Sequence, residues 1–400
     1  MKSDWKTVRG EEFIEFNPRL TIKKGAIATK IAMDKLKPFT KKIQETEKAE
    51  FSGGAKFCNG DTIMARITPC LENGKTAYVD ILEENEIAFG STEFIVLRAK
   101  EGISDSQFVY YLAVSPFFRN IAIKSMVGSS GRQRVQQNVL NDMPLVVPPL
   151  EIQREIGAYL AGIDEKISLN ERINDNLQQQ LRTIFKAKFT NNPELEKMTQ
   201  IPLSDLCHAV TKGTTPTTLG KSFVESGINF IKAESILNNH SIDKSKFAFI
   251  DEETNALLKR SVIHSGDIVF TIAGTLGRFA LIDDNVLPAN TNQAVAIIRA
   301  DTKKILPEYI YTCFIGEWHT DYYAKRVQQA VQANLSLATI KSLPIPVLDK
   351  DAMGEYLQLI LPIIRLLKGY EAQNESLAAL RDSLLPKLMS GEIDVSGIQR

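Results

Sequence analysis

A glycine-, threonine- and lysine-rich loop is the part of this chain that most resembles a phosphate-binding site. In "KGTTPTTLGKS", Gly213 and Gly220 are separated by six residues, and Pro216 lies between them. A Walker loop needs four residues between its glycines, because the length of the loop sets where its backbone amides meet the phosphates. The segment "ENGKT" at 72–76 has no upstream glycine at all. We therefore expect no nucleotide site in this chain.

The other residue types that carry out catalysis are scattered. The four histidines and four cysteines show no metal-ligand spacing, and the cysteines form neither a CxxC motif nor a disulfide framework. The sequence contains no Gly-x-Gly-x-x-Gly fingerprint, and its one Pro-Pro pair, in "VPPL", is not the Asp/Asn-Pro-Pro-Tyr segment of an adenine methyltransferase. These observations predict no catalytic site, no metal and no resident cofactor, with the cysteines as reduced thiols.

Two loops combine basic and amide side chains, which is chemistry suited to DNA. They are "KSMVGSSGRQRVQQN" (124–138) and "AKRVQQAVQANLS" (324–336). Arginine and lysine pair with phosphates or guanine edges, and glutamine or asparagine can form two bonds with adenine. A solvated loop is the alternative. Together with "NPRLTIKKG" (17–25), "VTKGTTPTT" (210–218) and the arginines flanking two "GD" segments, they give these candidate DNA-binding residues: Arg19, Lys23, Lys24, Arg66, Lys124, Ser129, Ser130, Arg132, Arg134, Gln136, Lys212, Thr214, Arg278, Lys325, Arg326, Gln328 and Gln332.

Length and charge limit the classes of protein to consider. The chain has 400 residues, which predicts two or more domains, and 44% of them are hydrophobic. Its 48 basic and 48 acidic residues give no net charge, which argues against a stand-alone non-specific DNA binder but not against local basic loops. No apolar run reaches the roughly 18 residues of a membrane span, and the N-terminus lacks a signal-peptide core. We expect a cytoplasmic protein with no membrane partner.

The elements that must position these loops occur twice. "GDTIMARI" (60–67) resembles "GDIVFTIA" (266–273), "QFVYYLAVSPF" (107–117) resembles "EYIYTCFIGEW" (308–318), and "MPLVVPPL" (143–150) matches "LPIPVL" (343–348). "STEFIVLRA" likewise resembles "NQAVAIIRA". Each half therefore predicts short strands, a helix, a loop, a proline-flanked strand and then a long helix.

The long helices carry the strongest pattern. After Pro149, apolar residues or asparagines recur from 156 to 184 at alternating spacings of four and three, which is typical of a coiled-coil seam. Adding 200 to each position keeps the phase, with Arg381 as the one charged intruder. Asn174 and Asn374 occupy equivalent positions, where they either set the register or are solvated. The predicted seam residues are Ile156, Leu160, Ile163, Ile167, Asn174, Leu177, Leu181, Ile360, Ile363, Leu367, Asn374, Leu377 and Leu384.

One such helix cannot bury its own seam, so the two helices are expected to pack on each other. The globular domain between them allows an antiparallel pairing. The fold class is therefore predicted as α+β: two globular α/β domains in tandem repeat, joined by two long antiparallel helices in a coiled coil with pseudo-twofold symmetry. The expected boundaries are 1–148 for domain 1, 149–190 for the central helix, 191–348 for domain 2, and 349–400 for the C-terminal helix and tail.

The arrangement of these motifs resembles the specificity (S) subunit of type I restriction–modification systems. "MPLVVPPLEIQREIGAYLAGIDEKI" in the centre and "LPIPVLDKDAMGEYL" near the end carry the likeness, with "GDIVFTIAGTLGRFALI" and "KGTTPTT" in the globular regions. The resemblance covers the whole chain, and it is specific as an arrangement rather than through any one motif. "LPIPVLDKDAM" departs from the family pattern because it lacks a second Pro-Pro-Leu-Glu run.

This resemblance implies a non-catalytic DNA-recognition subunit. Each globular region would be a target-recognition domain that reads one half of a bipartite site in double-stranded DNA. The coiled coil would set the spacer and dock modification (methyltransferase) subunits, two in number. Restriction/translocase subunits would join them. The resemblance places S-adenosylmethionine, ATP and Mg in those partners and no cofactor in this chain.

Three other interpretations remain open at the level of sequence. A stand-alone DNA methyltransferase or nuclease would need a cofactor loop or a carboxylate–lysine cluster, and neither is found. A non-DNA coiled-coil adaptor would bind no DNA selectively, even with partners present. A recombined specificity gene would have no working partner.

Overall fold

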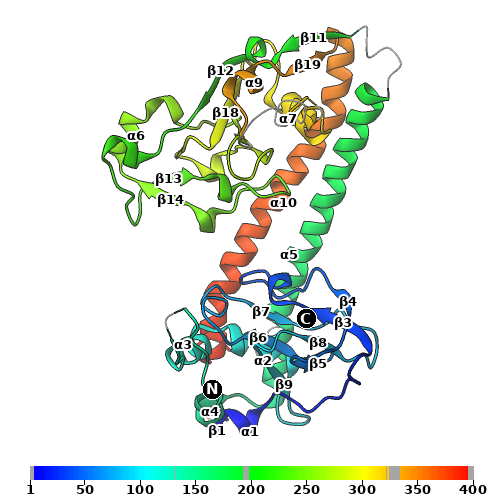
Figure 1. Cartoon of the computed structure of the whole chain (residues 1–400), viewed down its shortest axis with the longest axis vertical. Helices are drawn as coiled ribbons and strands as arrows, with labels where there is room; N and C mark the ends of the chain where they lie inside the picture. The colour runs from blue at the N-terminus through cyan, green and yellow to red at the C-terminus, as the bar shows by residue number, and fades with distance from the viewer. Residues whose placement is uncertain (1–3, 130, 192–197, 321, 324–333, 395–400) are drawn as a thin grey trace. The chain divides into compact units, whose positions relative to one another are not determined.

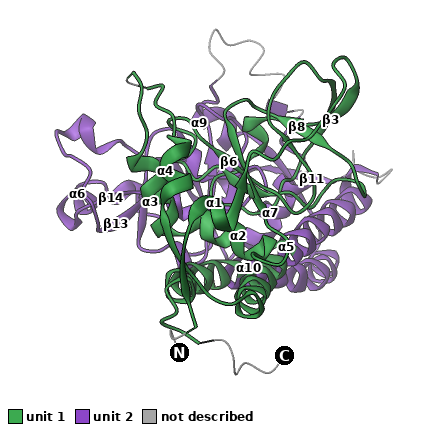
Figure 2. Cartoon of the chain, turned by 90° about the horizontal axis from the view of Figure 1, so that it is seen from below, with its two compact units in different colours: residues 1–168, 374–400 green, residues 169–373 purple. Residues whose placement is uncertain are grey.

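The protein is described here by a computed structural model, which covers residues 4–129, 131–191, 198–320, 322–323 and 334–394. The chain forms two compact units. Unit 1 consists of Met1–Ser168 and Asn374–Arg400, and unit 2 is Leu169–Gln373 (Figure 2). The two long helices, α5 (Leu150–Phe185) and α10 (Lys350–Met389), each contribute one stretch to both units.

Unit 1 is built from short strands and helices that precede α5. The helices are α1 (Gly10–Phe13), α2 (Ser106–Val114), α3 (Pro116–Lys124) and α4 (Gln137–Asp142). The strands are β1 (Lys6–Arg9), β2 (Ile14–Phe16), β3 (Ile27–Ile31), β4 (Glu47–Glu50), β5 (Lys56–Phe57), β6 (Thr62–Ala65), β7 (Thr76–Tyr78), β8 (Ala88–Gly90), β9 (Phe94–Ala99) and β10 (Pro144–Val147). They form sheets of order β2-β9-β6-β7 and β4-β3-β8-β5, and a β1-β10 pair (Figure 1).

Unit 2 repeats this plan. Its helices outside α5 and α10 include α6 (Glu252–Leu257), α7 (Pro307–Ile315) and α9 (Leu337–Lys341). Its strands are β11 (Thr199–Pro202), β12 (Cys207–Lys212), β13 (Ile228–Ile231), β14 (Ala248–Ile250), β15 (Ile268–Thr271), β16 (Phe279–Leu281), β17 (Ala289–Thr291), β18 (Val295–Ala300) and β19 (Pro344–Val347). The sheets are β12-β18-β15-β16 and β14-β13-β17, with a β11-β19 pair.

The same buried ion pair fixes the central strands of each unit. Arg98 of β9 donates two hydrogen bonds of 2.7 Å to the carboxylate of Asp61, which is 1% exposed. In unit 2, Arg299 of β18 donates bonds of 2.8 and 2.6 Å to Asp267, also 1% exposed. Both aspartates belong to the "GD" segments, so the sequence repeat corresponds to a repeated structural framework.

The central strands bury both of their faces because alternate residues enter different cores. In β9, Ile95 and Leu97 pack with α2 and the long helices, whereas Phe94 and Val96 pack on the opposite face. This period of two is what a strand dictates. In β18 the same alternation separates Ala296 and Ile298 from Val295 and Ile297.

The long helices lie side by side and antiparallel within each unit (Figure 1). In unit 1, the Asn374 amide donates to the Ile167 carbonyl at 3.4 Å. In unit 2, the Asn170 amide donates to Gln373 Oε1 at 2.7 Å. The expected α+β fold with tandem domains and paired helices is confirmed in these features. No helix among the described residues is long and apolar enough to cross a membrane.

The predicted seam residues are largely buried or half-buried, with a local shift in α10. Ile156, Leu160, Leu177 and Leu181 are buried in α5. In α10, Ile360 and Leu367 are fully buried; the remaining predicted positions Ile363, Asn374, Leu377 and Leu384 are half-buried. The neighbours Ile364 and Leu385 are more buried than the predicted Ile363 and Leu384. The helix therefore turns slightly away from a strict heptad.

Candidate nucleic-acid interface

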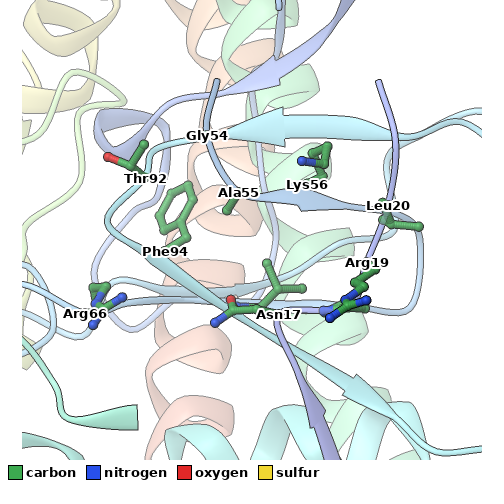
Figure 3. A pocket seen from close by; sticks show the side chains of 11 residues that line it. Asn17, Arg19, Leu20, Gly54, Ala55, Lys56, Arg66, Thr92 and Phe94 are labelled. Carbon is green, nitrogen blue, oxygen red and sulfur yellow. The ribbon is translucent and has the colours of Figure 1, made fainter. Parts of the chain in front are cut away.

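A pocket of about 440 Å³ opens in unit 1 between the segment that follows β2, the start of β5, the end of β6 and the start of β9. Arg19, Lys56 and Arg66 contribute basic side chains to its lining (Figure 3). Asn17 adds an amide, and Phe94 adds an aromatic ring. Three cations, an amide and a ring around one hollow can bind phosphate and contact base edges.

The Gly/Ser loop of unit 1 is attached to the rim of this pocket. Val135 N donates to the Arg66 carbonyl at 2.9 Å, and Thr68 N donates to the Gln133 carbonyl at 3.0 Å. Arg134 forms β-bridges with Ile67 and Val127. The segment 131–136 of this loop is therefore held by backbone bonds beside the pocket, although it lies about 65 residues further along the chain.

Arg66 is positioned with part of its bonding capacity unused. Its Nη2 donates to the Val135 carbonyl at 3.2 Å. Its Nε is buried and has no hydrogen-bond partner in the structure. A buried guanidinium donor without a partner is unfavourable, which makes Arg66 the side chain of this pocket that most needs an acceptor.

Arg134 is held by a carboxylate from the same rim. Its guanidinium donates to both oxygens of Glu93, and this bonding lowers the pKa of the Glu93 carboxyl. The Glu93 carbonyl in turn accepts from Arg66 N at 2.9 Å. Glu93 therefore links the two arginines that the sequence placed in separate motifs.

Unit 2 has the same backbone connection but different side chains. Leu335 N donates to the Ile272 carbonyl at 2.9 Å, as Val135 N does to the Arg66 carbonyl. Ile272, which is buried, thus occupies the place of Arg66. In the loop that follows β12, the Thr215 hydroxyl donates to the side-chain oxygen of Gln293. The frameworks match, whereas the side chains at this position differ.

The structure brings together some of the predicted DNA-binding residues. Arg19 and Arg66 line the pocket, and Arg134 and Gln136 lie in the loop at its rim. Exposed positions away from the described pocket lining are Lys23, Lys24, Lys124, Ser129, Arg132 and Lys212. Thr214 and Arg278 are half-exposed, and Arg278 donates to the Ile236 carbonyl at 3.2 Å. Ser130, Lys325, Arg326, Gln328 and Gln332 lie outside the described residues. Contact with DNA stays a prediction for all of them.

Sequence reasoning missed Lys56 and Glu93. Lys56 lies in the two-residue strand β5 and has no recognisable motif around it. Glu93 lies in a segment identified only as a strand, and its pairing with Arg134 spans 41 residues. Within the described ranges, no cluster of three histidine, cysteine or acidic side chains is arranged to hold a metal ion.

The chain is similar to known proteins in sequence and in fold. A family model for the type I restriction modification DNA specificity domain matches residues 2–179 and 196–358. The type I restriction enzyme EcoAI specificity subunit of Escherichia coli is 29% identical over 37% of this chain, a match that spans about a quarter (26%) of that protein. The HindI specificity subunit of Haemophilus influenzae is 22% identical, over 84% of this chain and 86% of that protein's length. The solved type I S subunit from M. genitalium is 15% identical and covers 96% of each chain with a TM-score of 0.55, a likeness of fold alone.

Proposed function

The chain belongs to the type I restriction–modification DNA specificity family, and we propose that each of its two units reads one half of a bipartite DNA site. Its function is DNA sequence recognition, and it is a specificity subunit rather than the catalyst. The observation that supports a divided site is the contrast between Arg66 and Ile272 on one repeated framework. Equal scaffolds with unequal side chains at the same place are suited to reading two different half-sites.

The interface of unit 1 supplies both kinds of contact that such reading requires. Arg19 and Lys56 are suited to phosphates, which position a protein on DNA. Arg66 lines the pocket with a guanidinium group, and Gln136 carries an amide, so these two are suited to base edges. The pairing of α5 with α10 would set the distance between half-sites, because helix length fixes separation at about 1.5 Å per residue.

Specificity subunits of type I systems assemble with methyltransferase and restriction subunits. We assign two modification subunits to this chain, docked along the paired helices, with the restriction subunits joining them. S-adenosylmethionine, ATP and Mg would then belong to those partners, and the assembly would act in the cytoplasm, where the host DNA lies.

The deciding experiment is co-expression with a type I modification subunit, followed by mapping of N6-methyladenine across host DNA at single-base resolution. A single split motif with a fixed gap, which disappears when this chain is omitted, is the expected result. Methylation without this chain would favour the non-DNA adaptor or a specificity gene with no working partner. A stable complex without any motif would favour the non-DNA adaptor.

The role of the helices has its own test in the same assay. Matched insertions of two turns within 163–184 and within the equivalent stretch of α10 should lengthen the gap between half-sites. An insertion in α5 alone should abolish methylation, because it breaks the pairing of the seams. An unchanged gap after matched insertions would rule out the helices as the spacer.

A further inference from the structure

The pairing of α5 with α10 contains one ion pair whose counterpart is apolar. Residue numbers in α10 exceed their equivalents in α5 by 200, so a contact between 164 and 381 corresponds to one between 364 and 181. In unit 1, Arg381 Nη1 donates to Asp164 Oδ1 at 2.7 Å, and Asp164 is 8% exposed. In unit 2, Ile364 and Leu181 belong to the same buried apolar cluster. At this pair of equivalent positions, the helix contact is charged in unit 1 and apolar in unit 2.

Unit 1 is built to accept the acidic side chain. The hydroxyl of Tyr111 donates to Asp164 Oδ2 at 2.6 Å, and the buried Lys41 ammonium donates to that hydroxyl at 3.3 Å. The equivalent of Tyr111 in α7 is Thr312. Its hydroxyl donates to the Tyr309 carbonyl at 2.8 Å, so the tyrosine that binds Asp164 in unit 1 is replaced by a threonine bonded to its own helix.

The C-terminal parts of α5 and α10 also pack against side chains of different size. Phe185 of α5 is fully buried in unit 2 against Gly316, where an added Cβ would lie 2.0 Å from its ring. In unit 1, the equivalent helix position holds Leu385, and Ser115 occupies the place of Gly316. A phenylalanine at that helix position would meet a side chain in unit 1, whereas unit 2 offers a glycine.

We propose that the Asp164–Arg381 pair is a pairing selector, which makes α5 accept α10 and reject the α5 helix of a second copy of this chain. In an α5–α5 pair, each Asp164 would face Leu181, and in an α10–α10 pair, each Arg381 would face Ile364. Either arrangement buries a charge without its partner, which is strongly unfavourable, whereas the native pairing matches charge with charge and apolar with apolar. The Phe185–Gly316 contact adds a steric preference in the same direction. This inference does not depend on the proposed function.

Single substitutions in the full-length chain can reproduce the mismatched contact of each like-with-like helix pair. D164I places isoleucine opposite Arg381, which is the mismatch of an α10–α10 pair. R381L places leucine opposite Asp164, which is the mismatch of an α5–α5 pair. The double variant D164I/R381L copies the Ile364–Leu181 contact of unit 2. The control is D382N, because Asp382 also contacts Arg381 but is largely exposed.

We expect each single variant to lower the thermal unfolding midpoint by roughly 5–10 °C, since each removes the opposite charge that faces a largely buried ionised side chain. The double variant should recover to within about 2 °C of the unsubstituted chain, and D382N should stay within about 1 °C, as an exposed ion pair contributes little. The recovery also shows that the substituted residues fit the fold. The selector would be refuted if the single variants unfolded at the same midpoint as the unsubstituted chain. It would also be refuted if the double variant lowered the midpoint by as much as the two single variants together.

Discussion

The guanidinium of Arg134 donates three hydrogen bonds, of 2.6 to 3.1 Å, to the carboxylate of Glu93. The pair lies at the rim of the unit 1 pocket, beside Arg66. A cation already held by a carboxylate is positioned but partly neutralised. A DNA phosphate must therefore share or replace the Glu93 carboxylate in order to bind Arg134.

Replacing Glu93 with glutamine should consequently strengthen non-specific DNA binding. E93Q keeps the size of the side chain but removes the competing charge, whereas R134Q removes the cation. In the complex with modification subunits, R134Q should reduce the salt dependence of DNA binding. The slope of the logarithm of the DNA-binding constant against the logarithm of the salt concentration should fall in magnitude by about 1, because one fewer counterion is released. E93Q should raise affinity for non-specific duplex at low salt.

Fluorescence anisotropy over a salt series measures both effects. R9Q is the matched control, because Arg9 is also exposed and paired with carboxylates, those of Glu11 and Asp142, but it does not line the pocket. An unaltered slope in R134Q would remove Arg134 from the DNA contact.

Ile272 of unit 2 suggests a matched substitution for Arg66 in the pocket of unit 1. R66I places in unit 1 the residue that unit 2 holds at position 272, so the framework already tolerates that side chain. Loss of the Arg66 donor should relax discrimination at one half-site by about 1–3 kcal/mol and leave the other half unchanged. Binding to duplexes altered in one half at a time tests this. Equal losses in both halves would indicate a general structural effect instead.

The start of α5 is fixed to unit 1 by a buried glutamine. Gln153 Nε2 donates to the Pro148 and Ile103 carbonyls at 2.9 and 3.1 Å, and its Oε1 accepts from Asp105 N at 3.0 Å. Met353 occupies the equivalent place in α10.

Q153M should therefore be destabilising, whereas M353Q should be nearly neutral. The first leaves three backbone groups without a partner and should lower the free energy of unfolding by about 2–4 kcal/mol. The second adds a polar group to a half-buried position. Chemical denaturation compares the two variants directly. Equal stability of both would mean that water replaces the glutamine bonds.

A buried histidine makes unit 2 sensitive to acid. His319 is 7% exposed and lies against the rings of Phe270 and Phe314, and burial lowers its pKa to about 3. The unfolded chain has the ordinary histidine pKa of about 6.5, so it binds more protons than the folded chain between these values. Stability should therefore fall as pH decreases from about 6.5 toward 3.

The equivalent position in unit 1 holds the buried Phe118, so H319F is a substitution that the repeat itself offers. It should reduce the loss of stability between pH 7 and 5 by up to about 2 kcal/mol. Thermal unfolding at both pH values checks this, with the exposed His208→Asn as control. An unchanged pH dependence in H319F would show that other groups account for the acid sensitivity.

Much of the architecture followed from local pattern. The "GD" segments became β6 and β15, and the heptad runs became α5 and α10, because strand and helix periods are expressed in consecutive residues. The repeat predicted two equivalent units. Arg19, Arg66 and Arg134 were identified as basic residues in loops, although the sequence did not indicate that they share one rim.

The sequence by itself therefore determined the tandem domains and the paired helices, since these depend on periodicity and repetition along the chain. Its resemblance to the specificity family indicated DNA as the ligand. Tertiary structure alone decided the pairings: Glu93 with Arg134, Lys56 with the pocket, and Arg381, the charged intruder of the seam, with Asp164. The physical reason is that each pairing joins residues distant in sequence, and its stability depends on burial and orientation. No local pattern records those quantities.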